Sequence, residues 1–200
     1  QGIYVNYKNI MDSTRLQLPF GIAQIGKAFR NEITARQFIF RTREFEQMEL
    51  QYFVKPTEDL EEFNQWKEQR WNYYINNLGI STNNLQWHKH EKLAFYAKAA
   101  FDIEYKFPFG FQEIEGIHAR GDYDLSQHQK YSGVKLDYYD PISHETFIPH
   151  IVEASSGVGR VFLMLLAEAY GEENLPDGSK RIVLHLKPAL APIKVAVFPL

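Results

Sequence analysis

GKAFRNE at residues 26–32, followed by FRTREFEQME at residues 40–49, has the pattern of two neighbouring β-strands that carry a binding site. Side chains of a strand alternate between its faces, so Arg41, Phe45 and Glu49 would share one face at steps of about 13 Å. A guanidinium pairs with phosphate, an aromatic ring accepts a base, and a carboxylate accepts an ammonium group. This order predicts a site for a nucleotide and an amino acid. The alternative, an exposed hairpin with alternating charges, leaves Phe45 as a lone apolar residue on a charged face.

A second stretch, PHIVEASSGVGR at residues 149–160, is typical of a strand that turns into a helix. Glu153 and Ser155 would share a strand face, and the small residues after them would let a ligand approach the backbone closely. Arg160 would open the helix, where its charge adds to the N-terminal dipole and favours an anion such as a triphosphate. Taken alone, this stretch is explained better as a structural corner with glycines for packing. It is not a Walker P-loop, because no Lys-Ser or Lys-Thr follows the glycines.

These residues carry a resemblance to a known family. Residues 30–49, with R-N-E and then R-x-x-x-F and an acid four positions on, resemble the second signature of class II aminoacyl-tRNA synthetases, and residues 149–160 resemble the third. The sequence of residues 30–53 is similar to that of the bacterial, homodimeric kind of glycyl-tRNA synthetase. GIHARGDYDL at 116–125 and LAPIKVAVFPL at 190–200 extend the resemblance over nearly the whole chain.

The resemblance implies an α+β fold, in which an antiparallel sheet is flanked by helices and interrupted by a helical insertion at about residues 55–105. Residues 1–180 would form the catalytic core. Residues 181–200 would be a linker and the first strand of a truncated anticodon-binding domain. The first three residues, QGI, match the close of the family's first signature, so part of the dimer interface and one wall of the pocket would lie upstream.

The implied activity is that of a glycine-tRNA ligase, which joins glycine to ATP as glycyl-adenylate and then transfers glycine to tRNA(Gly). ATP and Mg²⁺ would be the cofactors, and the full-length protein would form a homodimer in the cytoplasm. One competing interpretation is a non-catalytic relative that binds nucleic acid or a partner, such as the accessory subunit of mitochondrial DNA polymerase. Retention of Arg30 and Arg160 disfavours it. A class II synthetase for another amino acid is a third interpretation, for which E-A-S-S-G would be unusual.

The resemblance also assigns site residues. Arg30 would hold the α-phosphate and the carboxylate, Glu32 the adenine amino group, and Arg41 the distal phosphates. The base would stack between Phe45 and Arg160. Arg30 and Arg160 are the catalytic candidates, and the ATP site would comprise Arg30, Asn31, Glu32, Phe40, Arg41, Thr42, Arg43, Glu44, Phe45, Glu113, Ile114, Gly157, Val158, Gly159 and Arg160.

Glycine would occupy a pocket with no room for a side chain, so no editing site is demanded. Glu49, Glu153 and Ser155 would receive its ammonium group, and Glu153, a hard oxygen ligand, would also bind Mg²⁺. Arg120, at the end of a strand, would hold a carboxylate or phosphate, or else pair with Asp122 or Asp124. The glycine site would comprise Phe45, Glu46, Gln47, Met48, Glu49, Arg120, Glu153, Ala154, Ser155, Ser156 and Gly157.

Local patterns give further expectations for secondary structure. Alternation predicts a strand over residues 3–7, and periodicity predicts helices from Thr57 to Gly79 and from about His90 to Phe101. A strand over residues 107–117 would place Glu113 and Glu115 on one face, and Arg30 and Glu32 would share a face of the first strand. The helix over residues 161–170 would bury the apolar run Val161, Phe162, Leu163, Leu165 and Leu166.

Composition sets outer limits on function. The chain has 200 residues, 44% of them hydrophobic, which suffices for the core of one domain. It has no apolar run of membrane-spanning length and no signal pattern, and zero cysteines exclude disulfides. A net charge of −3 gives no general basic surface, so a tRNA contact must be local or lie elsewhere. His88 and His90 lack partners for a zinc site, and the other histidines suit structural or surface roles. No G-x-S-x-G elbow appears, which argues against a serine nucleophile.

Overall fold

The computed structural model of the chain describes residues 1–199 and is built on a six-stranded sheet in the order β1-β2-β8-β5-β4-β3. Every neighbouring pair in this sheet is antiparallel. The predicted α+β class is therefore confirmed. The strands are β1 (Phe20–Phe29), β2 (Glu44–Val54), β3 (Leu85–Lys89), β4 (Ala99–Phe107), β5 (Gly110–Gly121) and β8 (His150–Gly157).

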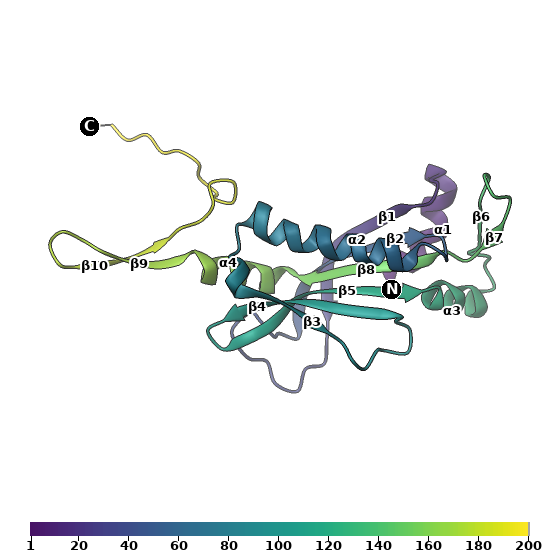
Figure 1. Cartoon of the computed structure of the whole chain (residues 1–200), viewed down its shortest axis with the longest axis horizontal. Helices are drawn as coiled ribbons and strands as arrows, with labels where there is room; N and C mark the ends of the chain where they lie inside the picture. Colours follow the sequence, from purple (N-terminus) through teal and green to yellow (C-terminus); the bar gives the residue numbers. More distant parts are fainter. Residues whose placement is uncertain (200) are drawn as a thin grey trace.

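Helices cover both faces of the sheet, as Figure 1 shows for the long helix across it and the two short helices at its end. The long helix α2 (Asp59–Asn72) continues into a π-helical turn, η1 (Tyr73–Leu78), and ends at Gly79, whose φ is 79°. It packs with α4 (Val158–Ala169) on one face, where Val152 is buried. On the other face α1 (Gly2–Thr14) and α3 (Tyr123–Ser132) enclose a second core that contains Ile151. Because adjacent strand residues point to opposite faces, Ile151 and Val152 separate the two cores.

The remaining elements are short and lie at the ends of the sheet. The hairpin β6 (Tyr138–Tyr139) and β7 (Thr146–Phe147) follows α3, and η2 (Thr82–Asn84) precedes β3. The hairpin β9 (Tyr170–Asn174) and β10 (Lys180–Leu184) projects away from the sheet (Figure 1). Residues 185–199 contain no helix or strand. The assignment of residues 181–200 to a further domain stays a prediction, and Leu200 lies outside the described residues.

Two predictions of secondary structure are wrong. Residues 3–7 belong to helix α1 and not to a strand: Ile3, Tyr4 and Tyr7 are buried, a helical spacing, while Val5 is 65% exposed. The predicted helix from His90 to Phe101 does not form: residues 90–98 are a loop that joins β3 to β4, and residues 99–101 begin β4. Within the expected insertion, the structure has one long helical segment, α2 with η1, the short helix η2, and two strands of the main sheet, β3 and β4. No helix of the described chain is long and apolar enough to cross a membrane.

Two finer expectations about side-chain direction are also wrong. The pairing of β4 with β5 shifts between Ile103 and Glu104, so Ile114 is the extra residue of a β-bulge. The bulge turns Glu113 toward one face and leaves Glu115 on the other. In α4 the apolar run is not uniformly buried, because Phe162 is 52% exposed while Met164 is fully enclosed.

Candidate active site

A cavity of about 200 Å³ lies on the face of the sheet opposite to the one that α2 and α4 cover. Strands β2, β5 and β8, the loop of residues 30–43 and the start of α4 all contribute to its lining. The structure thus brings together residues that are more than 100 positions apart. The lining includes fourteen residues that the sequence predicted: Arg30, Glu32, Phe40, Arg41, Thr42, Phe45, Gln47, Glu113, Glu153, Ser155, Ser156, Gly157, Gly159 and Arg160.

Ten predicted residues do not line this cavity. Met48 and Ala154 lie instead beside a second cavity next to α2, as strand alternation requires, and Glu49 borders that second cavity as well. Ile114 is buried in the helix-covered core. The others are Asn31, Arg43, Glu44, Glu46, Arg120 and Val158. Conversely, Tyr96, Gly116 and His118 line the cavity although none was predicted to do so.

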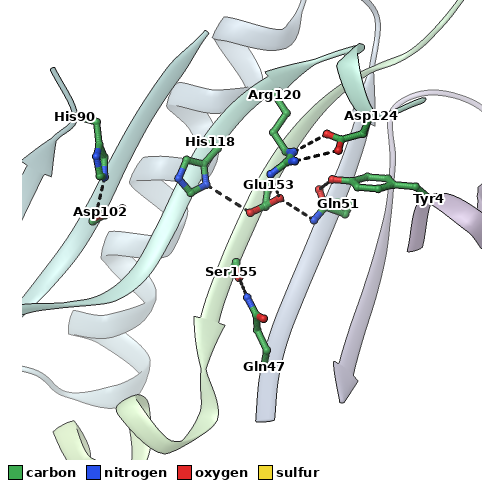
Figure 2. Close-up of polar contacts among 10 residues, drawn as sticks. All are labelled: Tyr4, Gln47, Gln51, His90, Asp102, His118, Arg120, Asp124, Glu153 and Ser155. Carbon is green, nitrogen blue, oxygen red and sulfur yellow. Dashed lines mark hydrogen bonds and ion pairs between the residues drawn. The ribbon is translucent and has the colours of Figure 1, made fainter. Parts of the chain in front are cut away.

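One end of the cavity, which the sequence predicts to hold the amino acid, is formed by a small lattice of side chains on three adjacent strands. In antiparallel pairs, directly opposed residues share a face. Gln51 on β2 is opposite Glu153 on β8, which is opposite His118 on β5. One step along the strands, Glu49 is opposite Ser155, which is opposite Gly116. The predicted ammonium acceptors Glu49, Glu153 and Ser155 therefore lie on one face of the sheet, in two neighbouring rows. Figure 2 shows Gln51, Glu153 and His118 of the first row and Ser155 of the second.

Glu153 is the most highly connected acid of this lattice (Figure 2). Its Oε2 accepts hydrogen bonds from Arg120 Nη1 at 2.8 Å and from Gln51 Nε2 at 3.0 Å. His118 Nδ1 lies 3.5 Å from Oε1. Burial alone would raise the pKa of the Glu153 carboxyl, but its contacts with His118, Arg120 and Gln51 hold that pKa below its ordinary value. Glu153 is therefore an ionised acid at neutral pH.

Arg120 acts from behind this acid. Its Nε and Nη2 hold Asp124 at 2.8 and 3.1 Å, and its guanidinium carbon lies 4.1 Å from the ring centroid of Tyr96. With Nη1 on Glu153, all three guanidinium nitrogens are engaged and the side chain does not line the cavity. Pairing with Asp124, which the sequence left open, is thus what the structure shows.

The contacts of Glu153 also test it as a ligand for Mg²⁺. A guanidinium 2.8 Å from Oε2 would repel a divalent cation at that oxygen, and Gln51 also donates to it, so Oε2 is not available as a metal ligand. Among the described residues, no three acids or histidines are grouped as a metal site. The donor set around Glu153 therefore does not fit a magnesium ion.

The other end of the cavity, which the sequence predicts to hold the nucleotide, contains two pairs of an arginine with an aromatic ring. The guanidinium carbon of Arg30 lies 5.3 Å from the ring centroid of Phe45, and that of Arg160 lies 4.4 Å from the ring centroid of Phe40. Arg160 donates to the carbonyl of Phe40 at 3.2 Å and to that of Glu113 at 3.0 Å. The bulge at Ile114 is what makes Glu113 available on this face. Cations above aromatic planes are suited to phosphates and a base.

The loop of residues 30–43 differs from the predicted geometry. Strand β1 ends at Phe29 and β2 begins at Glu44, so Arg41 is not in a row with Phe45 and Glu49 on one strand. Arg41 instead pairs with Arg36 in an isolated bridge and forms a 3.1 Å ion pair with Glu32. The side chains of Arg41 and Glu32 still line the cavity from the loop.

The turn from β8 into α4 needs small residues for a steric reason. A Cβ atom on Gly159 would lie 3.2 Å from the carbonyl oxygen of Ile39, so glycine here lets the loop approach the start of the helix without a shift of the backbone. Arg160 is the third residue of α4, at the N-terminal end where the helix dipole favours an anion.

Comparisons with known proteins agree with this geometry. Residues 1–169 match the family described as tRNA synthetase class II core domain (G, H, P, S and T). The chain is 56% identical over 200 residues to the glycine–tRNA ligase of Chlorobaculum tepidum, covering 100% of the chain and 42% of that relative. It is 58% identical over 204 residues to that of Borrelia hermsii, covering 100% and 46%. For that of Clostridium acetobutylicum the identity is 54% over 202 residues, covering 100% and 44%.

The chain spans less than half the length of these curated relatives. Its match to the family model nevertheless covers most of its residues, including both signature stretches and every strand of the main sheet. The chain belongs to the class II tRNA synthetase core domain family.

Proposed function

We propose that the protein containing this chain is a glycine–tRNA ligase, which activates glycine with ATP and transfers it to tRNA(Gly). The observation that supports this most is the common cavity of Arg30, Phe45 and Arg160 with Glu153 and Ser155. It joins groups for a nucleotide to acceptors for an ammonium group. The three relatives described above are all named glycine–tRNA ligases.

The first step needs positioning and neutralisation of charge more than proton transfer. A carboxylate oxygen of glycine attacks the α-phosphorus of ATP, a new phosphorus–oxygen bond forms, and the bond to the β-phosphate bridge breaks to release pyrophosphate. Arg30 and Arg160 stabilise the negative charge that develops, and Phe45 stacks on the adenine. In the second step, a terminal hydroxyl of tRNA attacks the activated carbonyl, and AMP leaves.

The amino-acid end would select glycine by charge and by size. Glu49 and Glu153 supply negative charge for the ammonium group, and Ser155 supplies an oxygen beside them. Gln47 Nε2 donates to Ser155 Oγ at 2.5 Å, which fixes the hydroxyl at the edge of the cavity. A larger amino acid would have to displace side chains that neighbouring strands hold in register.

Other parts of the proposal rest on the family alone. ATP and Mg²⁺ enter because this family uses a nucleotide with a divalent metal, and we assign no metal ligand in this chain. tRNA(Gly) as a partner, a homodimer of the full-length protein and a cytoplasmic location are proposals of the same kind. For a non-catalytic role, the described cavity offers no supporting observation, since its arginines are in place.

The test is glycine-dependent exchange between ATP and labelled pyrophosphate, measured on the longer protein that contains this chain. We expect exchange with glycine and, at equal concentration, at least about 100-fold less with alanine, as a size-limited pocket requires. Exchange with another amino acid but not with glycine would contradict the proposed substrate. Absence of exchange with every amino acid would contradict catalysis.

A further inference from the structure

His118 is directly opposite Glu153 and lines the same cavity. Its Nδ1 is buried and has no normal hydrogen-bond partner among residues 1–199, and the carboxylate oxygen Oε1 of Glu153 lies 3.5 Å away. That distance is longer than an ordinary hydrogen bond, and contacts in an empty site often shorten when a substrate binds. The ring is therefore aimed at Glu153 and at the ligand space beside it.

The two oxygens of Glu153 are held unequally. Oε2 accepts hydrogen bonds from Arg120 and Gln51, at 2.8 and 3.0 Å. Oε1 faces only His118 among these donors. A proton on His118 Nδ1 would therefore fix the direction of the oxygen that remains available to a ligand cation.

Gly116 shows that the position of the His118 ring is built into the strand. A Cβ atom on Gly116 would lie 2.8 Å from His118 Cε1 and 3.4 Å from Asp102 Oδ1. Any side chain at Gly116 would thus push the ring away from its place. Asp102 is itself held by a contact with His90, drawn in Figure 2, in which His90 Nε2 lies 2.8 Å from Asp102 Oδ2.

We propose that His118 is a positioning residue for glycine activation, which donates from Nδ1 to Glu153 and orients Oε1 toward the ammonium group of glycine. This inference rests on the proposed function and adds a determinant of glycine affinity to it. His118 does not touch the reacting atoms, so its loss raises the KM for glycine and leaves the KM for ATP unchanged. Asparagine at position 118 can place an N–H near the position of Nδ1, whereas leucine fills similar space without a donor.

The experiment measures glycine-dependent pyrophosphate exchange for the parent protein, His118→Asn, His118→Leu and the control His88→Leu. His88 is a half-exposed histidine on β3, outside the cavity. We expect His118→Leu to raise the glycine KM about tenfold, as for one hydrogen bond to a charged group, with the ATP KM within twofold of the parent. His118→Asn and His88→Leu should stay within threefold of the parent for both substrates.

Each possible result decides the matter. An active parent with an unchanged glycine KM in His118→Leu overturns the positioning role and leaves the proposed function intact. Equal losses in His118→Asn and His118→Leu overturn donation from Nδ1. A parent that shows no glycine-dependent exchange overturns the proposed function together with the role of His118. If His118→Leu fails to fold, Gly116→Ala replaces it, and an unchanged glycine KM in that variant overturns the proposal.

Discussion

Arg120 ties Glu153 on β8 to Asp124 at the start of α3, with Nη1 2.8 Å from the first acid and Nε 2.8 Å from the second. Both acids are largely buried. Removing one member of a buried ionic cluster leaves the others without compensation. We therefore expect Arg120→Ala to reduce the free energy of unfolding by about 3 to 5 kcal/mol, measured by urea denaturation. The control Arg181→Ala removes the exposed pair with Glu173 and should cost less than about 1 kcal/mol. Equal losses in the two variants would contradict the buried anchor.

Glu153 should also make stability depend on pH. Its contacts hold the folded-state pKa below the ordinary 4.5, so its contribution is fully present above that pH and disappears as the pH falls through the folded value. The difference in unfolding free energy between the parent and Glu153→Gln should therefore shrink below a pH of about 4.5. Urea denaturation at several pH values from neutral to acid measures this difference. A constant difference would mean that folding does not depress the pKa of this carboxyl.

Glu49 offers the most direct test of recognition of the ammonium group. It forms no ion pair among the described residues, since Arg43 donates to the carbonyls of Glu32 and Ile33 instead. Burial, reinforced by the charge of Glu153, raises the pKa of the Glu49 carboxyl. A ligand cation nearby would favour the ionised carboxylate and offset this effect. Glu49→Gln should raise the glycine KM by roughly tenfold or more and change the ATP KM little. A variant that loses thermal stability but retains the parental glycine KM would indicate a structural role only.

Arg30 is expected to act on the phosphates and not on folding. Its guanidinium lies over Phe45 and lines the cavity. Arg30→Ala should lower the rate of adenylate formation by about 100-fold, or about 3 kcal/mol, as for the loss of a charged stabiliser. Single-turnover kinetics on the longer protein measure this rate. An unchanged rate would refute the assigned role.

Phe45 is expected to contribute to nucleotide affinity. Phe45→Ala should weaken ATP binding by about 1 to 3 kcal/mol, the usual range for the loss of base stacking. Phe38, which is 79% exposed in the neighbouring loop, provides a control whose replacement by alanine should leave ATP affinity unchanged. Calorimetry with ATP and, separately, with glycine distinguishes the two ligands. A loss of glycine affinity alone would show that the ring lies at the other end of the site.

Much of the sheet could be predicted because alternation is a local signal. Residues 44–54 and 150–157 form strands at the places where charged and apolar residues alternate. Alternation failed over residues 3–7, because α1 buries Ile3, Tyr4 and Tyr7, and a stretch of five residues fits either period. The bulge at Ile114 could not be predicted, since it depends on the register between two strands.

The site was predictable where residues follow one another and unpredictable where strands meet. The signature stretches supplied Arg30, Phe45, Glu153 and Arg160 directly. His118 was set aside because a lone histidine has no informative spacing. Its position two residues before Arg120, which was expected at the end of a strand, was the available signal, because residues two apart on a strand share a face. Tyr96 reaches the cavity from a loop that was expected to be helical.

The two ends of the cavity stand on different kinds of backbone. Glu153 and Ser155 belong to β8, which is paired with β2 on one side and β5 on the other, so their mobility is already restricted before a ligand arrives. Arg41 and Thr42 belong to a loop between strands, which side-chain contacts and one isolated bridge hold in place of a continuous ladder of backbone hydrogen bonds. Ordering a loop costs conformational entropy, whereas a residue fixed between two strands has little left to lose. Glycine would therefore bind to a preformed site, whereas binding of the nucleotide would itself order part of the loop that contacts it.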